Sequence, residues 1–232
     1  MSFSRDQEQS WRIQSTKQSY IVNRGLGSSQ DDYENNLTAF RGDSLCTTIE
    51  KKITAAAGRH PISIFDAGCG EGDFLLDAAQ KWGRSVTLSG VSAYPYHEEK
   101  PDKREKIAAN NITITIENLE KYQRQSVHDV IASVYALGYV FDPIGTLIRL
   151  YAALKPGGVA YIYPFSFRSQ GKKDGEKLTT YLENRYGFDY QSPRSVAFEK
   201  TKEELRIPAV IADSEEETII FDKVRAVYRF NW

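Results

Sequence analysis

Apolar and polar positions along the middle of the chain follow two different periods, and these predict strands that alternate with helices. Residues 62–65 form a mostly apolar run that suits a buried parallel strand. Residues 112–116 alternate strictly between Ile and Thr, which is typical of a strand. Three further strands are predicted at residues 85–91, 127–134 and 159–163. Strands that alternate with helices indicate a parallel sheet with right-handed crossovers.

Apolar positions at helical spacing predict the helices between these strands. Asp43 can cap a helix that runs through residues 45–57 and ends near Gly58. A second helix begins at Phe74, and a third covers residues 144–154, where Lys-Pro-Gly-Gly stops it. Residues 93–106 are predicted to form a loop followed by a short helix. A further helix is predicted at residues 177–186.

Composition and charge narrow the class of protein. The 232 residues are 41% hydrophobic, which is enough for the core of one large α/β domain with additional segments around it. Thirty basic side chains against thirty-one acidic ones give no broad positive field, which disfavours a nucleic-acid partner. No apolar stretch approaches the roughly 20 residues that span a bilayer, so no membrane partner is expected.

The cysteines, the histidines and the first residues bear on location and metal binding. Two cysteines are too few for a disulfide framework and favour a reducing, cytoplasmic location. The polar first residues give no sign of a signal peptide. The three histidines and two cysteines show no metal-ligand spacing, so no metal is expected.

The most informative segment is a glycine loop directly after the first predicted strand. Asp66 is followed by Gly68, Gly70 and Gly72 in the pattern Asp-x-Gly-x-Gly-x-Gly, and helical character begins at Phe74. Glycines let the backbone turn sharply and approach a ligand closely. In open α/β sheets, ligands bind where the carboxyl end of a strand meets the next helix. The spacing differs from the Gly-x-Gly-x-x-Gly of dinucleotide-binding sites.

This loop resembles the first motif of the class I S-adenosylmethionine-dependent methyltransferases. Three later segments fall in the order and spacing of that family, at residues 89–92, 129–135 and 154–158. The resemblance covers residues 43–163 well and the tail weakly. It implies an α/β fold with a doubly wound, mostly parallel seven-stranded sheet, helices on both faces and an antiparallel C-terminal strand. It also implies S-adenosyl-L-methionine as the cofactor.

The same resemblance implies which residues bind that cofactor. The glycine loop would pack against the methionyl part, and Asp66 would hold its amino group. After the third strand, Asn118 would bind the adenine amino group while Leu119 packs on the ring. Ser133 and Val134 would flank the methionyl group at the end of the fourth strand. The expected set is Asp66, Gly68, Cys69, Gly70, Gly72, Ser92, Asn118, Leu119, Ser133 and Val134.

Ser92 departs from the family pattern. The family usually ends its second strand with Asp or Glu, whose two carboxylate oxygens accept hydrogen bonds from both ribose hydroxyls. A serine hydroxyl makes one such bond without charge assistance. Glu98, Glu99 or Asp102 in the following segment are candidates to replace it. The departure leaves three outcomes open: weaker cofactor binding, a rearranged ribose site, or a protein that has lost its enzymatic activity.

The catalytic residues and the acceptor are inferred from the position of the site and from the general composition. Methyl transfer from a sulfonium needs mainly alignment, with a base for some acceptors. The candidates are Tyr135, Tyr139 and His97, with Glu199 as a further base. Near-neutral charge and an aromatic N-terminal stretch favour an enzyme that methylates an O or N of a small-molecule acceptor.

Two other functions stay open from the sequence. One is a non-catalytic methyltransferase-like binding or regulatory protein, which the serine at position 92 motivates. The other is a protein or RNA methyltransferase, which the basic segment 168–177 motivates, although a solvated loop is the expectation for that segment.

The two ends of the chain give a weaker pattern. Residues 1–42 are polar with scattered aromatics and predict an N-terminal arm or lid, either ordered or partly disordered. Residues 43–232 form the expected methyltransferase domain, in which residues 164–232 carry insertions on the substrate side. The family ends in an antiparallel pair of strands. This pair is either 218–221 with 224–230, or it uses 195–198 as the sixth strand, with 199–214 inserted.

Overall fold

A seven-stranded sheet carries the fold in the computed structural model, which describes residues 30–37, 39–95, 97–137, 140, 143–163, 172–192 and 195–205. The strands are β1 (Ile62–Ala67), β2 (Val86–Ser92), β3 (Thr113–Ile116), β4 (His128–Val134), β5 (Leu154–Tyr163), β6 (Asp189–Ser192) and β7 (Ser195–Glu199). Their order in the sheet is β3-β2-β1-β4-β5-β7-β6. The first five of these run parallel, and β7 is antiparallel to both of its neighbours. The predicted mostly parallel sheet with an antiparallel C-terminal strand is confirmed.

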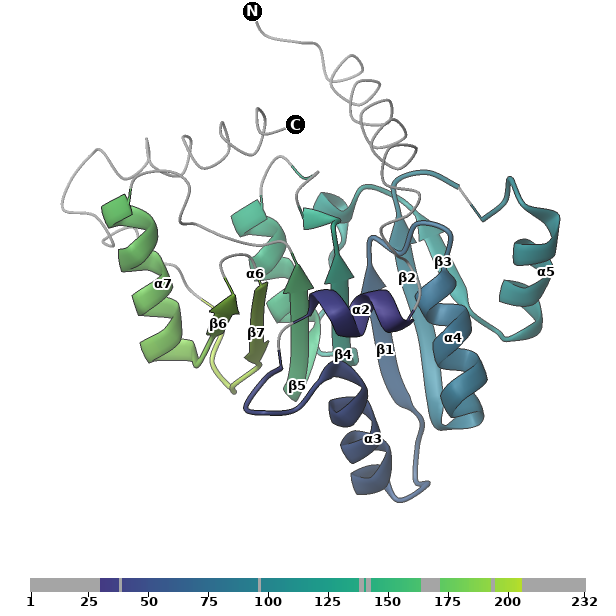
Figure 1. Cartoon of the computed structure of the whole chain (residues 1–232), viewed down its shortest axis with the longest axis horizontal. Coiled ribbons are helices and arrows are strands. Elements are labelled where there is room, and N and C mark those ends of the chain that lie inside the picture. The colour runs from purple at the N-terminus through teal and green to yellow at the C-terminus, as the bar shows by residue number, and fades with distance from the viewer. Residues whose placement is uncertain are drawn as a thin grey trace, which may run out of the picture.

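Helices cover both faces of the sheet (Figure 1). They are α2 (Gln30–Asn36), α3 (Leu45–Ala56), α4 (Asp73–Trp82), α5 (Pro101–Ala109), α6 (Pro143–Ala153) and α7 (Lys172–Tyr186), with short 3₁₀ turns η1 (Gly83–Ser85) and η2 (Leu119–Lys121). On the face of α2, α3 and α4, Phe74 lies in one buried cluster with Tyr161 of β5. On the other face, Leu150 of α6 and Leu182 of α7 share a cluster with Phe198 of β7. The apolar β1 is buried between these two layers, as its sequence predicts.

The fifth strand begins earlier than predicted. β5 starts at Leu154, because the Lys-Pro-Gly-Gly segment is paired and does not form a free turn. The Gly157 amide donates to the Lys200 carbonyl at 2.9 Å, and the Lys200 amide donates to the Gly158 carbonyl at 2.8 Å. A register irregularity between His128 and Val130 of β4 accommodates the change.

The antiparallel pair of the described sheet, β6 with β7, differs from the predicted arrangement in which 195–198 is the sixth strand. Residues 195–199 form a strand, but it is β7, which lies between β5 and β6, and not the sixth strand. The sixth strand is β6, whose sequence Asp-Tyr-Gln-Ser has a single apolar position and so lacks a strand signal. The other predicted pair, at 218–221 and 224–230, lies outside the described residues.

Two further segments are more helical than predicted. Helix α7 begins at Lys172, so the later part of the basic segment 168–177 is helical and not a loop, while 168–171 lies outside the described residues. Within the polar segment 1–42, residues 30–36 form helix α2, which crosses the sheet on the same side as α3 (Figure 1).

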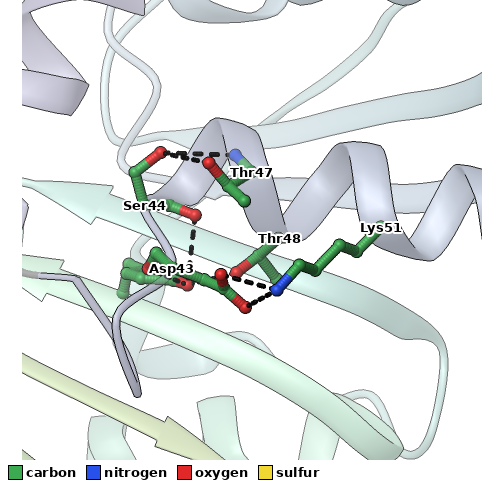
Figure 2. A network of polar contacts seen from close by, with 6 residues as sticks. Asp43, Ser44, Thr47, Thr48 and Lys51 are labelled. Carbon is green, nitrogen blue, oxygen red and sulfur yellow. Dashed lines mark hydrogen bonds and ion pairs between the residues drawn. The ribbon is translucent and has the colours of Figure 1, made fainter.

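Ser44, not Asp43, caps helix α3. Ser44 has an extended backbone, and its Oγ accepts a hydrogen bond from the Thr47 amide at 3.3 Å (Figure 2). Asp43 lies one residue too early for this role. Its carboxylate instead accepts two hydrogen bonds of 2.7 Å from Lys51 Nζ (Figure 2).

Tyr161 ties this start of α3 to the sheet. Its buried hydroxyl lies 2.5 Å from Thr48 Oγ1 and 3.1 Å from the Asp43 carbonyl. We expect Tyr161→Phe to lower the free energy of unfolding by about 1–2 kcal/mol, because it leaves buried acceptors without a donor. Lys51→Ala, which breaks an exposed ion pair in the same network, should cost about 0.5 kcal/mol or less. Urea unfolding at pH 7 measures both, and equal losses would contradict this assignment.

Candidate active site

The glycine loop joins β1 to α4 at the carboxyl end of the parallel strands. The amides of Gly68 and Cys69 both donate to the Val91 carbonyl, at 3.0 and 2.9 Å, and so fix the loop to the end of β2. The Gly72 amide donates to the Cys69 carbonyl at 2.8 Å and closes the turn. Gly72 has a φ of +82° and leads directly into α4. The sequence pattern therefore produces the strand–turn–helix junction at which α/β folds bind ligands.

Two glycines are required here by close packing. Gly68 has a φ of +99°, and a Cβ at this position would lie 2.1 Å from the Ala136 Cβ, after the end of β4. A Cβ on Gly90 of β2 would lie 2.8 Å from both the Cβ and the Sγ of Cys69. The Cys69 side chain thus fills the space above Gly90 and is itself buried. The loop is held close against β2 and β4 because neither glycine carries a side chain.

Asp66 is the buried acid of the site. Its side chain is fully buried, and its Oδ1 accepts a 2.7 Å hydrogen bond from the hydroxyl of Tyr33 on α2. Its Oδ2 has no hydrogen-bond partner among the described residues. Burial raises the pKa of Asp66 to about 7, and the Tyr33 hydrogen bond opposes that rise. A buried carboxylate oxygen with unused acceptor capacity suits a cationic or hydrogen-bond-donating ligand group.

The end of β4 lies beside this acid. Ser133 is buried, and its Oγ donates to the Ala67 carbonyl at 2.7 Å, which joins the ends of β4 and β1. Val134 ends the strand and is also buried. Tyr135 follows with a φ of +63°, a strained conformation for a residue with a side chain. Its hydroxyl donates to Asn36 Oδ1 of α2 at 3.3 Å, so α2 reaches both β1 and β4.

Ser92 uses its hydroxyl proton locally. Its Oγ donates to the Tyr94 carbonyl at 2.7 Å and accepts from the Tyr94 amide at 3.5 Å, so one lone pair of the oxygen remains for a ribose hydroxyl. Among the acids considered as replacements, Glu99 accepts a 2.5 Å hydrogen bond from the Tyr94 hydroxyl. Asp102 lies in the first turn of α5, and Glu98 is exposed.

Asn118 and Leu119 are also engaged within the protein. Asn118 caps η2, where its Oδ1 accepts from the Glu120 amide at 2.9 Å and its Nδ2 donates to Glu120 Oε2 at 3.1 Å. Leu119 lies in the core cluster on the α6 face of the sheet. Both follow β3, as the sequence predicts, and their side chains are held by neighbours.

Two of the remaining catalytic candidates, His97 and Glu199, lie in described parts of the chain, on different elements. His97 is buried in the loop between β2 and α5, with no partner for its Nδ1 among the described residues. Burial lowers its pKa, and Glu98 opposes that shift. Tyr139 lies outside the described residues. Glu199 pairs with Val159, four residues before the end of β5, and holds Arg41, so its placement as a base is wrong.

Several residues at this edge carry no recognisable signal in the sequence. Tyr33 lies in a polar segment, and nothing local indicates that its hydroxyl reaches Asp66. Glu71, between the last two loop glycines, is buried and pairs with Lys100 and Lys103 of the segment that begins α5. These ion pairs connect the glycine loop to the element that follows the ribose position.

Comparison with known proteins identifies the family. A family model described as "Methyltransferase domain" matches residues 37–197, well over half of the chain. The chain belongs to this methyltransferase family. The resemblance to S-adenosylmethionine-dependent enzymes is thereby confirmed, and S-adenosylmethionine is the cofactor that the family implies.

Individual relatives are distant from this methyltransferase. The malonyl-[acyl-carrier protein] O-methyltransferase 2 of Ilyobacter polytropus is 29% identical over 105 residues, which are 44% of this chain and 39% of that protein. The chain therefore spans about two fifths of the length of this relative. The structure of DszA carbon methyltransferase is similar with a TM-score of 0.53 and 13% identity, over 69% of this chain and 53% of that one. A putative S-adenosylmethionine-dependent methyltransferase from Methanococcus maripaludis has a TM-score of 0.48 and 16% identity, over 68% and 86%.

The residues present at this edge fit the implied cofactor. The unused Oδ2 of Asp66 suits an amino group, and the positive φ angles of Gly68 and Gly70 give the turn a backbone that suits close contact with the methionyl part. Among the described residues, no group of three or more His, Cys, Asp or Glu side chains is arranged to hold a metal ion. Within the same described ranges, no helix is long and apolar enough to cross a membrane.

Proposed function

We propose that this methyltransferase transfers the methyl group of S-adenosylmethionine to an oxygen or nitrogen of a small-molecule acceptor. The observation that carries the proposal is the buried Asp66 carboxylate, which has an unused oxygen beside a glycine loop held close to β2 and β4. The bound cofactor supplies a methyl group activated by a sulfonium. The chain's own task is to hold the acceptor in line with that methyl group and to exclude water.

Tyr135 is the proposed catalytic residue with the best support. It follows β4 at the ligand edge, and its left-handed backbone conformation turns the chain at that point. Its hydroxyl contacts Asn36, whose amide oxygen can orient it toward an acceptor. His97 is proposed as an alternative base from the β2 side of the site, because its Nδ1 is buried without a partner among the described residues. Tyr139 stays a sequence-based proposal.

Oxygen is the favoured acceptor atom. The Ilyobacter relative is named as an O-methyltransferase of malonyl-[acyl-carrier protein], and this supports transfer to oxygen. The balance of 30 basic and 31 acidic side chains supports a small molecule over a nucleic acid as partner. Neither cysteine of the chain takes part in a disulfide bond, which supports a cytoplasmic location.

Calorimetric titration tests the cofactor half of this proposal. We expect S-adenosylmethionine and its demethylated product to bind one site each. Asp66→Asn should weaken both by roughly tenfold or more, because a charged hydrogen bond to the amino group is lost. The matched control is Asp77→Asn, a half-buried acid in the middle of α4, which should leave the affinity unchanged. Absence of binding by the wild-type chain would contradict the proposal.

A methyl-transfer assay tests the acceptor half. With tritiated cofactor and a cell extract, we expect label in the low-molecular-mass fraction. Label in protein or RNA would contradict the small-molecule acceptor and support the macromolecular alternative.

A non-catalytic binding role is the second candidate, and Ser92 favours it. No carboxylate occupies the usual ribose-binding position, and the serine proton is committed to Tyr94. A non-catalytic protein would bind the cofactor and transfer no methyl group to any fraction. Restoring the acid with Ser92→Asp should then tighten binding without producing turnover.

A further inference from the structure

The Tyr33 side chain is held in one position by contacts with other segments, although the helix that carries it has only seven residues. Its ring stacks on Phe74 of α4, with ring centroids 4.2 Å apart and planes 7° from parallel. The ring is almost completely buried, and its hydroxyl donates to Asp66 Oδ1 at 2.7 Å. Both the orientation of the ring and the position of its hydroxyl are therefore fixed.

The helix that carries Tyr33 is held by two neighbours besides Asp66. Glu34 Oε1 accepts a 2.7 Å hydrogen bond from the Cys46 amide at the start of α3. Asn36 Oδ1 accepts from the Tyr135 hydroxyl at 3.3 Å. These contacts join α2 to the start of α3 and to the residue after β4, and so help to keep the Tyr33 hydroxyl next to Asp66 of β1.

The hydrogen bond from Tyr33 makes the two carboxylate oxygens of Asp66 unequal. Oδ1 is satisfied by the phenol, whereas Oδ2 is buried and has no partner among the described residues. A buried acceptor of this kind costs free energy unless something pairs with it. The ligand group that fits best is a cationic hydrogen-bond donor, and the amino group of the cofactor's methionyl part is one.

We propose that Tyr33 is a positioning residue, which holds Asp66 Oδ1 and so directs Oδ2 toward the amino group of the cofactor. The inference rests on the proposed cofactor binding and adds the residue on which the acid depends. It also gives the segment before residue 43 a defined part in the site.

The charges around Asp66 explain why it needs this support. Asp66 pairs in register with Gly90 of β2 and Ala132 of β4, neither of which titrates. Among the described residues, the titratable groups that act on the Tyr33–Asp66 pair are Cys69 of the glycine loop and Asp73 of α4, and neither brings a positive charge. The Tyr33 hydroxyl is thus the group that favours the ionised form of a carboxyl which burial would otherwise protonate.

The test is the pH dependence of ligand affinity in Tyr33→Phe. Binding of S-adenosylhomocysteine is measured by calorimetry between pH 6.0 and 8.5. We expect the variant to bind roughly tenfold more weakly near pH 6.5 and to approach the wild type near pH 8.5, because the pKa of its Asp66 lies higher. Phenylalanine keeps the ring on Phe74, and thermal unfolding checks that the fold is retained.

Methylthioadenosine is the matched control ligand, since it lacks the amino-acid part. Its affinity should be the same in the wild type and Tyr33→Phe at every pH. Tyr151→Phe is the matched control variant, because Tyr151 is a buried tyrosine whose hydroxyl lies 3.0 Å from Thr201 Oγ1 on the α6 face. It should leave both ligands and the pH profile unchanged.

A second measurement uses the pair Tyr33→Phe and Asp66→Asn. If Tyr33 acts through Asp66, adding Tyr33→Phe to Asp66→Asn should lower the affinity for S-adenosylhomocysteine by less than a further twofold. The inference is overturned if the pH profiles of the wild type and Tyr33→Phe are parallel, or if Tyr33→Phe loses as much affinity for methylthioadenosine as for S-adenosylhomocysteine. It is also overturned if the effects of Tyr33→Phe and Asp66→Asn on affinity are fully additive. Failure of the wild-type chain to bind either nucleoside would instead overturn the proposed function.

Discussion

Gly68→Ala is expected to weaken S-adenosylmethionine binding by about a hundredfold or more. The new Cβ would lie 2.1 Å from the Ala136 Cβ, a distance at which the glycine loop or the end of β4 has to move. A φ of +99° adds strain for any residue with a side chain. Strain and overpacking together cost about 2–5 kcal/mol, and the loop is the element that gives way. Calorimetric titration measures the affinity, and urea unfolding measures the accompanying loss of stability.

The contact with Ala136 provides a rescue experiment. Adding Ala136→Gly removes the Cβ that the new side chain meets, so the double variant should recover most of the affinity and keep only the backbone strain. Gly58→Ala is the matched control, because Gly58 has a φ of +73° but nothing within 4 Å of its Cβ position. It should cost about 1 kcal/mol of stability and no affinity. A Gly68→Ala variant that folds and binds normally would contradict the close-packed loop.

His128 is expected to make the protein about 3 kcal/mol less stable at pH 4 than at pH 7. Its ring is buried, with Nδ1 3.0 Å from Ser63 Oγ and Nε2 2.5 Å from the Tyr122 hydroxyl, and it stacks on Phe65. Burial, with a contribution from Lys155, lowers the pKa of His128 to about 4. The unfolded chain therefore binds a proton between about pH 6.5 and pH 4 that the folded chain does not. The loss begins below pH 6.5 and is complete near pH 4.

Urea unfolding at several pH values isolates this contribution. His128→Gln should be less stable at pH 7, but its stability should fall by about 3 kcal/mol less than that of the wild type as the pH drops to 4. The control His60→Gln replaces an exposed histidine before β1 and should keep the wild-type slope. Identical slopes for His128→Gln and the wild type would show that the buried ring does not resist protonation.

Local sequence carries most of the information about the fold and the glycine loop. The run before Asp66 and the glycines after it specify a strand, a turn and a helix within a few residues, so the junction was predictable. The residue that caps α3 was less predictable, because Asp43 and Ser44 are both good capping residues. The choice between them depends on Lys51 and on the bridge that Asp43 forms with Phe40.

The residues that the sequence did not reveal depend on contacts between distant segments. Tyr33 and Asp66 are 33 positions apart, and the Tyr33 side chain on this short polar helix is buried by contacts with Phe74 and Asp66, which are distant in the sequence. Ser92 was recognised as a departure, but its bond to the Tyr94 carbonyl depends on the shape of the turn that follows. Strand β6 pairs although its sequence has no alternation, because β7 offers it an edge.

The order of the strands also determines how much backbone the described sheet leaves open at its two edges. The two outermost strands of the described sheet, β3 and β6, are each four residues long. A border this short presents few backbone groups on which a second chain could add a strand, and short borders are one way in which proteins resist aggregation. The longest strand, β5, lies in the interior of the sheet between β4 and β7, where both of its sides are occupied.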